Sequence, residues 1–265
     1  MPVTPRGSGP ILADVREGVL AVVLNRPDRK NALDPQAWDE LFDVLREAEV
    51  DPDVRVVVIT GAGDAFCAGA DISAAPQGHP VTRVTRIAQT ANALFNLPKP
   101  TIAKVDGAAV GAGFNLALCC DFVVASDRSR FSEIFVRRGL SVDFGGSWLL
   151  PHMLGLQRAK QLVMLGDFVT AQEAAALGLV MSVVPAEGLS SAVSELAGRL
   201  VQGPPIAQTL NKQLVIEGSM SSFTSALAAE VKAQAVNYAT ADAGAARAAF
   251  SDKSTPVFTG EWRLS

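Results

Sequence analysis

Residues 98–155 read PKPTIAKVDGAAVGAGFNLALCCDFVVASDRSRFSEIFVRRGLSVDFGGSWLLPHMLG, and the rest of the chain is organised around this segment. Within it, Thr101–Val105 is short and rich in apolar and β-branched residues, which predicts a buried strand. Asp106-Gly107 is a turn signal, and Gly111-Ala112-Gly113 opens an apolar run that ends at Cys120. The pattern predicts a strand, a turn of small residues and the start of a helix. Because the first N–H groups of a helix have no partner within it and lie at the positive end of its dipole, the turn is a candidate anion or oxyanion site.

The same turn also fits a purely structural role, in which its glycines only let the helix pack closely against the strand. Gly111-Ala-Gly113-Phe-Asn-Leu lacks the last glycine of the dinucleotide-binding pattern, and no Gly-Lys-Ser/Thr of a phosphate-binding loop follows it. Neither nucleotide-binding motif is therefore present, while the oxyanion and structural interpretations both stay open.

Composition limits the class of protein. The 265 residues are 49% hydrophobic and 19% charged, which suits one large domain, or one domain with a small appendage, around a sizeable core. The net charge of −4 favours neither nucleic acid nor an anionic membrane surface as a partner. The three cysteines and two histidines have no metal-ligand spacing, so we expect no metal site and no disulfide framework. With no signal-peptide pattern and no run of about 18 apolar residues, we expect a cytoplasmic protein without a membrane span.

Strands and helices alternate along most of the chain, which predicts parallel pairing in βαβ units. We expect strands at 11–16, 19–24, 54–60, 101–105, 122–125 and 180–184. We expect helices at 35–50, 81–96, 132–137, 146–153, 156–165, 170–176, 187–201, 205–216 and 221–237, with one more ending near 250 and another after Gly113. Because strands cease near residue 200, we divide the chain into domains at 1–200 and 201–265.

A second turn of small residues, within Phe66–Ile72, also follows an expected buried strand. If neighbouring strands bring the two turns together, their N–H groups could converge on one oxygen. Two such donors on a thioester carbonyl would stabilise an enolate, and this kind of electrostatic stabilisation is often the largest catalytic contribution.

Several short segments, in this order, resemble the enoyl-CoA hydratase/isomerase (crotonase) superfamily over essentially the whole chain. The segments are Asn25–Leu33, Phe66–Ile72, Asp106–Gly113, Gly139–Gly146, Leu165–Val180 and Phe250–Lys253. The resemblance implies an α/β fold, with a spiral of ββα units over 1–200 that binds acyl-CoA. It implies that the helices of 201–265 trimerise and cover the active site, giving a homotrimer or a dimer of trimers. Coenzyme A would be part of the substrate, with no separate cofactor.

By position, the resemblance implies that the N–H groups of Ala70 and Ala112 hold the thioester oxygen. The residues implied to line or reach coenzyme A are Ala68, Gly69, Ala70, Asp71, Ile72, Arg29, Phe250 and Lys253. For Arg29 and Lys253, a solvated surface charge is the alternative interpretation.

The chain departs from the family's hydratases at the two positions where they carry catalytic glutamates, since Asn115 and Phe135 stand there instead. Hydration needs one group to activate water and another to handle the proton on the α-carbon, and neither of these side chains takes up a proton. Glu133 is nearby, but two residues along a helix correspond to about 200° around its axis, so we expect Glu133 to point away from the site. The resemblance therefore does not favour a simple hydratase.

Asp143 supplies a carboxylate at the position where the family's dienoyl-CoA and 1,2-epoxyphenylacetyl-CoA isomerases carry their catalytic aspartate. Moving a double bond needs only one base, and burial beside Val142, Phe144 and Phe135 would raise the pKa of this base toward the working range. An N-cap on the following helix is the alternative role for Asp143. Asn115 lies on the same helix face as Ala112, where it could bond substrate or water, or be a satisfied buried polar residue.

The sequence thus predicts an acyl-CoA enzyme that stabilises a thioester enolate. Its expected activity is enoyl-CoA isomerisation, by a double-bond shift or the opening of a ring epoxide, with Asp143 as the base. The alternatives are an enoyl-CoA hydratase of fatty-acid oxidation, a nucleophilic aspartate as in the family's aryl-CoA dehalogenases, and a non-catalytic acyl-CoA-binding homologue.

Overall fold

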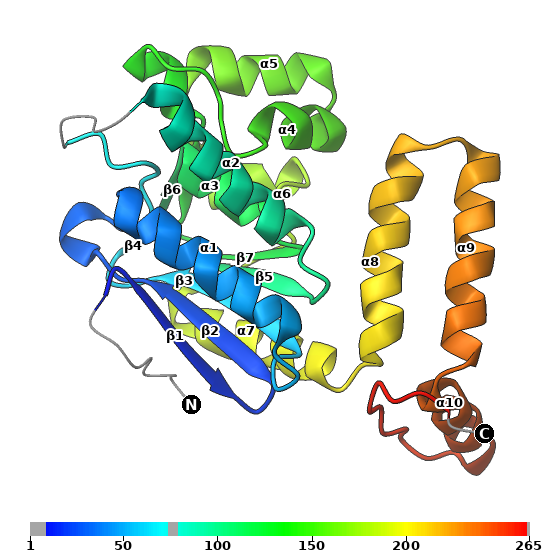
Figure 1. Ribbon diagram of the computed structural model, residues 1–265. Coiled ribbons are helices and arrows are strands. Elements are labelled where there is room, and N and C mark those ends of the chain that lie inside the picture. Colours follow the sequence, from blue (N-terminus) through cyan, green and yellow to red (C-terminus); the bar gives the residue numbers. More distant parts are fainter. Residues whose placement is uncertain (1–8, 74–78, 264–265) are drawn as a thin grey trace. The chain divides into compact units, whose positions relative to one another are not determined.

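The computed structural model describes residues 9–73 and 79–263 (Figure 1). It divides into two compact units, one of residues up to 97 with 101–197, and the other of residues 98–100 with those from 198 onward. The predicted loop over 74–80 lies mostly outside the described residues.

A six-stranded sheet forms the framework of the first unit, in the order β1-β2-β3-β5-β7-β10. Its strands are β1 (Ile11–Arg16), β2 (Val19–Leu24), β3 (Val56–Gly61), β5 (Thr101–Val105), β7 (Phe122–Ser126) and β10 (Ser182–Val184). The first two strands pair antiparallel as a hairpin, and every other neighbouring pair is parallel. The predicted α/β class and the parallel pairing are both confirmed.

A second sheet, in the order β4-β6-β8-β9, was not predicted from the sequence. Its strands are β4 (Ala65–Cys67), β6 (Ala108–Val110), β8 (Arg130–Ser132) and β9 (Val169–Thr170). Strands this short show no hydrophobic period, which explains why the sequence did not reveal them. They matter for the site because β4 and β6 each lead into one of the two turns of small residues.

The helices up to residue 201 follow the predicted helical segments closely. They are α1 (Pro35–Val50), α2 (Pro80–Phe95), α3 (Ala112–Cys119), α4 (Gly146–Leu154), α5 (Leu156–Leu165), α6 (Ala171–Ala176) and α7 (Leu189–Val201), with 3₁₀ turns at Pro27–Arg29 (η1), Ile134–Arg138 (η2) and Ala186–Gly188 (η3). As predicted, Asp34 caps α1, where its carboxylate accepts a hydrogen bond from the Ala37 N–H. The helices α1 and α2 pack side by side (Figure 1).

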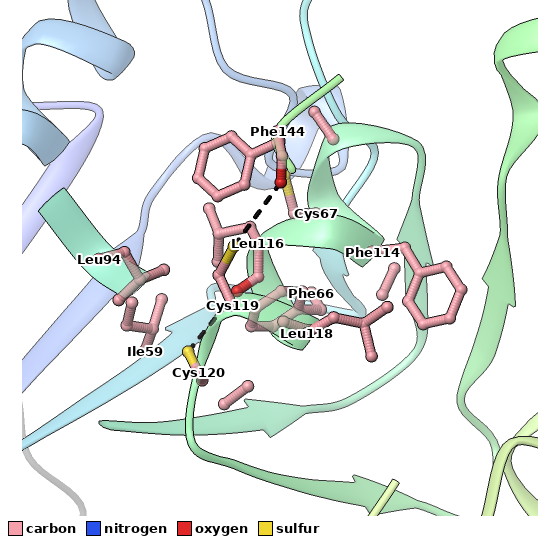
Figure 2. Packing of buried hydrophobic residues seen from close by; sticks show 14 of the residues in the cluster. Ile59, Phe66, Cys67, Leu94, Phe114, Leu116, Leu118, Cys119, Cys120 and Phe144 are labelled. Atoms are coloured by element: carbon pink, nitrogen blue, oxygen red, sulfur yellow. Dashed lines mark hydrogen bonds between the residues drawn. The ribbon is translucent and has the colours of Figure 1, made fainter. Parts of the chain in front are cut away.

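The central helix α3 is surrounded by the rest of the first unit, and all of its residues are buried. Figure 2 shows its Phe114, Leu116 and Leu118 surrounded by apolar side chains from other elements, among them Phe66 of β4 and Phe144 before α4. Full burial of each large side chain contributes about 1.5–3 kcal/mol. The core thus holds the start of α3, and with it the Gly111–Gly113 turn, in a fixed place.

The second unit consists of α8 (Pro205–Met220), α9 (Phe223–Tyr238) and α10 (Ala241–Asp252). The helices α8 and α9 form a hairpin (Figure 1). The buried Asp242 carboxylate accepts hydrogen bonds from the N–H groups of Thr259 and Gly260, which ties the C-terminal segment to α10. Among the described residues of the chain, none of the helices combines the length and the hydropathy that crossing a bilayer requires.

Candidate active site

The two turns of small residues lie against each other, because β4 and β6 pair as parallel neighbours. A Cβ added to Gly69 would lie 2.8 Å from the Val110 carbonyl oxygen and 3.3 Å from the Ala112 nitrogen. A Cβ on Gly113 would lie 2.2 Å from the Cys67 carbonyl oxygen. Since contacts this short exclude a side chain, glycine is required at both positions for the turns to approach. The condition set by the sequence, that neighbouring strands bring the turns together, is met.

Backbone N–H groups are left available on both sides of this junction. Among the described residues, neither the Ala70 N–H nor the Ala112 N–H has an acceptor, whereas the N–H groups of Asp71 and Gly111 are bonded. Ala112 is the first residue of α3, so its N–H belongs to the unpaired first turn. Ala70 is half-buried and Ala112 is buried. Both stay predicted oxyanion donors, now with a geometry suited to that role.

A residue that the sequence analysis did not single out, Arg26, braces the first turn. Its guanidinium lies 3.0 Å from the Asp71 carboxylate and 3.2 Å from that of Asp34 at the start of α1. Hydrogen bonds from Ser73 first, and then Arg26, hold the pKa of Asp71 below its usual range. The Asp71 carboxylate, predicted to line coenzyme A, is thus engaged within the protein. Because Asp71 directly follows Ala70, its ion pair with Arg26 supports the predicted oxyanion amide of Ala70.

Asn115 occupies the centre of the candidate site. It is fully buried on α3, and its Nδ2 donates to the backbone oxygen of Asp143 at 2.9 Å and approaches Oε2 of Glu133 at 3.4 Å. Its Oδ1 has no hydrogen-bond partner among the described residues. A Cβ on Gly146 would lie 2.5 Å from Nδ2, so α4 begins in direct contact with this amide. Asn115 therefore links α3 to the turn that carries Asp143.

Asp143 is not the N-cap of the following helix, because α4 begins at Gly146, its N-cap is Gly145 and no side chain caps it. The side chain is half-buried, and its Oδ1 is inaccessible and lacks a partner among the described residues. Burial raises the pKa of Asp143 to about 6. The neighbouring Phe144 is buried and packs on Trp38 with ring centroids 5.5 Å apart, which fixes the turn. The carboxyl is thus poised to titrate near neutral pH.

The expectation that Glu133 points away from the site was wrong. Glu133 follows strand β8 and precedes the 3₁₀ turn that begins at Ile134, so helical geometry does not apply to it. Its side chain is fully buried and faces Asn115. Burial, and next the negative charge of Asp143, raise the pKa of Glu133 to about 8. The signal that could have found it is strand alternation, since Phe131, two residues earlier, belongs to the core.

The remaining residues that the sequence singled out differ in how deeply they are buried. Phe135 is buried and lies near the second turn, since a Cβ on Gly111 would be 3.5 Å from its ring. Arg29 and Ile72 are exposed in the first unit, and Ala68 is half-buried with its N–H bonded to the Lys30 oxygen. Phe250 and Lys253 are exposed in the second unit. Their roles toward coenzyme A stay predictions.

Cys67, which lies next to the first turn, does not have the properties of a nucleophile. Burial raises the pKa of its thiol to about 12, and the thiol donates to the Asn31 oxygen at 3.2 Å. The thiol is therefore neutral and structural.

Comparison with known proteins now identifies the family. A family model described as enoyl-CoA hydratase/isomerase matches residues 14–261. The chain is 34% identical to the 1,2-epoxyphenylacetyl-CoA isomerase of Escherichia coli K12, covering 95% of this chain and 98% of that protein. It is 36% identical to the short-chain-enoyl-CoA hydratase of Clostridium acetobutylicum, covering 90% and 93%. The crystal structure of an enoyl-CoA hydratase from Bacillus anthracis matches with a TM-score of 0.92 at 32% identity, covering 96% of this chain and all of that one. The chain therefore belongs to the enoyl-CoA hydratase/isomerase family of the crotonase superfamily, as its motifs predicted.

Proposed function

We propose that the protein is an enoyl-CoA isomerase in which Asp143 carries the migrating proton. The observation that carries this proposal is a half-buried carboxyl with an unpartnered oxygen and a pKa near 6, on a turn linked by Asn115 to α3. A group that titrates near the working pH can both accept and return a proton. The likeness to an isomerase over nearly the whole chain supports the same choice.

The proposed reaction begins when the thioester oxygen binds the N–H groups of Ala70 and Ala112. The Asp143 carboxylate then removes a proton from the α-carbon, and the electron pair moves onto the thioester oxygen to give a dienolate. Asp143 returns the same proton two carbons away, which shifts the double bond and restores the carboxylate. Each amide donor of this kind is worth about 10²–10³ in rate, because it meets the charge that develops on the oxygen.

Hydration is a second candidate function, and one observation favours it. The structure places a second buried carboxyl, that of Glu133, on the Asn115 amide that also holds the Asp143 turn. Hydration needs two acid–base groups. Burial raises the pKa of Glu133 to about 8 and that of Asp143 to about 6, so one can be protonated while the other is ionised. The comparisons include relatives named for either activity.

Product masses separate these functions. The protein is incubated with 3-enoyl-, 2-enoyl- and ring-epoxide CoA thioesters, and products are followed by chromatography and mass spectrometry. Isomerisation changes the retention time without changing the mass, whereas hydration adds the mass of water. Binding without turnover of any ester would identify a non-catalytic acyl-CoA-binding protein instead.

Asp143→Asn tests the proposed base directly. The amide keeps the size of the side chain but takes up no proton, so we expect isomerisation to fall by about 10²–10⁴-fold, the usual contribution of a general base. Binding of the CoA ester, measured by calorimetry, should stay within a few-fold. Full residual activity would reject the role of Asp143.

A further inference from the structure

Three oxygens in the candidate site lack hydrogen-bond donors. Oε1 of Glu133, Oδ1 of Asp143 and Oδ1 of Asn115 are all inaccessible and have no partner among the described residues. These residues share one donor, Nδ2 of Asn115. It donates to the backbone oxygen of Asp143 at 2.9 Å, and its hydrogen bond to Oε2 of Glu133 is long, at 3.4 Å. A buried polar atom without a partner is costly, and one added proton on a carboxyl of this cluster would turn one of the three acceptors into a donor.

No cation in the described part of the chain compensates these carboxyls. The ion pairs formed by its arginines involve other acids, and Arg137, on the 3₁₀ turn directly after Glu133, pairs with Asp167. The groups that face Glu133 are the neutral amide of Asn115 from α3 and the carboxyl of Asp143 from the turn before α4. Two neighbouring carboxyls without a cation do not both ionise readily, because each charge opposes the other.

The proton belongs to Glu133 rather than to Asp143, because burial is more complete there. Glu133 is fully buried, whereas Asp143 is half-buried. Desolvation disfavours the charged form most where water is most completely excluded. The pKa values agree with this order of burial, since burial raises the pKa of Glu133 to about 8 and that of Asp143 to about 6. Between these values Asp143 is a carboxylate and Glu133 is a neutral acid.

Building on the isomerase proposed above, we propose that Glu133 is a positioning residue that acts as a carboxylic acid. Its O–H supplies the donor that the acceptor cluster lacks, so that Asn115 and the Asp143 turn keep their places. It also leaves Asp143 as the one negative charge of the cluster. When Glu133 ionises, the donor is lost and a second charge faces both Asp143 and the dienolate, which shuts the reaction down on the alkaline side.

Glutamate labelled with ¹³C at the carboxyl tests the protonation state in the free protein, without any substrate. One glutamate signal of the wild type should titrate near pH 8, and Glu133→Gln should remove that signal. Glu195→Gln, at an exposed position of α7, is the matched control and should leave it in place. A set of glutamates that all titrate near their ordinary value of about 4.3 would overturn the proposal.

The pH profile of kcat tests the consequence for catalysis. With a 3-enoyl-CoA ester, wild-type kcat should fall about tenfold for each pH unit above the Glu133 pKa. Gln stays neutral and keeps the shape, so Glu133→Gln should retain kcat within about threefold at pH 7 and lose most of the alkaline decline. An unchanged decline in this variant would overturn the proposal. So would a loss of kcat at every pH equal to that of Asp143→Asn, since Glu133 would then transfer the proton itself.

The two measurements keep this proposal separate from the isomerase proposal. If no ester is isomerised, the isomerase proposal fails, and the ¹³C titration still decides whether Glu133 holds a proton. If isomerisation is found and Glu133 titrates as an ordinary acid, only the role of Glu133 fails.

Discussion

At the scale of single residues, the proposed chemistry depends on the protonation of Asp143. A free aspartate has a pKa of about 3.9, and burial at this position raises the pKa to about 6. The raised pKa means that the folded protein binds this proton more tightly than the unfolded chain does. Stability from this group is therefore present below about pH 4 and is lost as the pH rises through about 6. At neutral pH the ionised Asp143 therefore destabilises the folded protein, but only this ionised form can act as a base.

The same pKa predicts the acid side of the activity profile. Only the carboxylate form of Asp143 accepts a proton, so kcat/KM with a 3-enoyl-CoA ester should fall about tenfold per pH unit below about 6. The measurement is the initial rate at subsaturating substrate from pH 4.5 to 8. Circular dichroism at each pH checks that the protein stays folded. A flat profile between pH 5 and 7 would contradict the assignment of Asp143 as the base.

At the scale of elements, the contact between α3 and α4 positions Asp143. Gly146 is the first residue of α4, and a Cβ there would lie 2.5 Å from Nδ2 of the buried Asn115. Asn115 is fully buried, and its Nδ2 is held by the backbone oxygen of Asp143 at 2.9 Å, so a Cβ at position 146 would displace that amide. The hydrogen bond from Asn115 to the Asp143 oxygen thus requires glycine at position 146.

Gly146→Ala should therefore both destabilise the protein and impair catalysis. We expect a loss of about 1–3 kcal/mol in the free energy of unfolding, the usual cost of overpacking, with a fall in kcat as the Asp143 turn shifts. Urea unfolding and steady-state kinetics measure the two effects. Gly198→Ala in α7 is the control, because a Cβ there meets nothing within 4 Å. It should leave kcat near wild type and raise the free energy of unfolding by up to about 1 kcal/mol, since alanine is the better helix former. Equal behaviour of the two variants would show that the contact does not matter.

The elements themselves differ in how far the sequence could predict them. The Asp34 cap and the long amphipathic helices carry local signals, so their bounds were predicted to within a few residues. Strands such as β6 and β8 have only three residues each, and tertiary pairing decides them instead of local pattern. Because β8 was not foreseen, Glu133 was assigned to a helix and given the wrong direction. Arg26 was missed for a related reason, since its partners Asp34 and Asp71 are separated from it in sequence.

At the scale of the whole molecule, the apolar surface of the second unit needs an explanation. Among the exposed apolar side chains of α8 and α9 are Val215, Phe223 and Val231, with exposed fractions of 73%, 78% and 70%. Val215, Leu227 and Val231 line one groove between the two helices. Exposed apolar side chains gathered along one groove are typical of an interaction site. The family resemblance predicts that copies of this chain associate, and this surface offers them an apolar face.

Substitutions on that face should therefore change the mass in solution. Leu227 and Val231 are four residues apart on α9 and share one side of the helix, so Leu227→Asp with Val231→Asp places two charges in the predicted contact. Light scattering should give a multiple of the 27.7 kDa chain for the wild type and a single chain for the double variant. Ser194→Asp, at an exposed position of α7, should keep the wild-type mass. Because both changed side chains are partly or largely exposed, far-UV circular dichroism should remain that of the wild type, which separates dissociation from unfolding. A double variant that stays folded with an unchanged mass would place the association surface elsewhere.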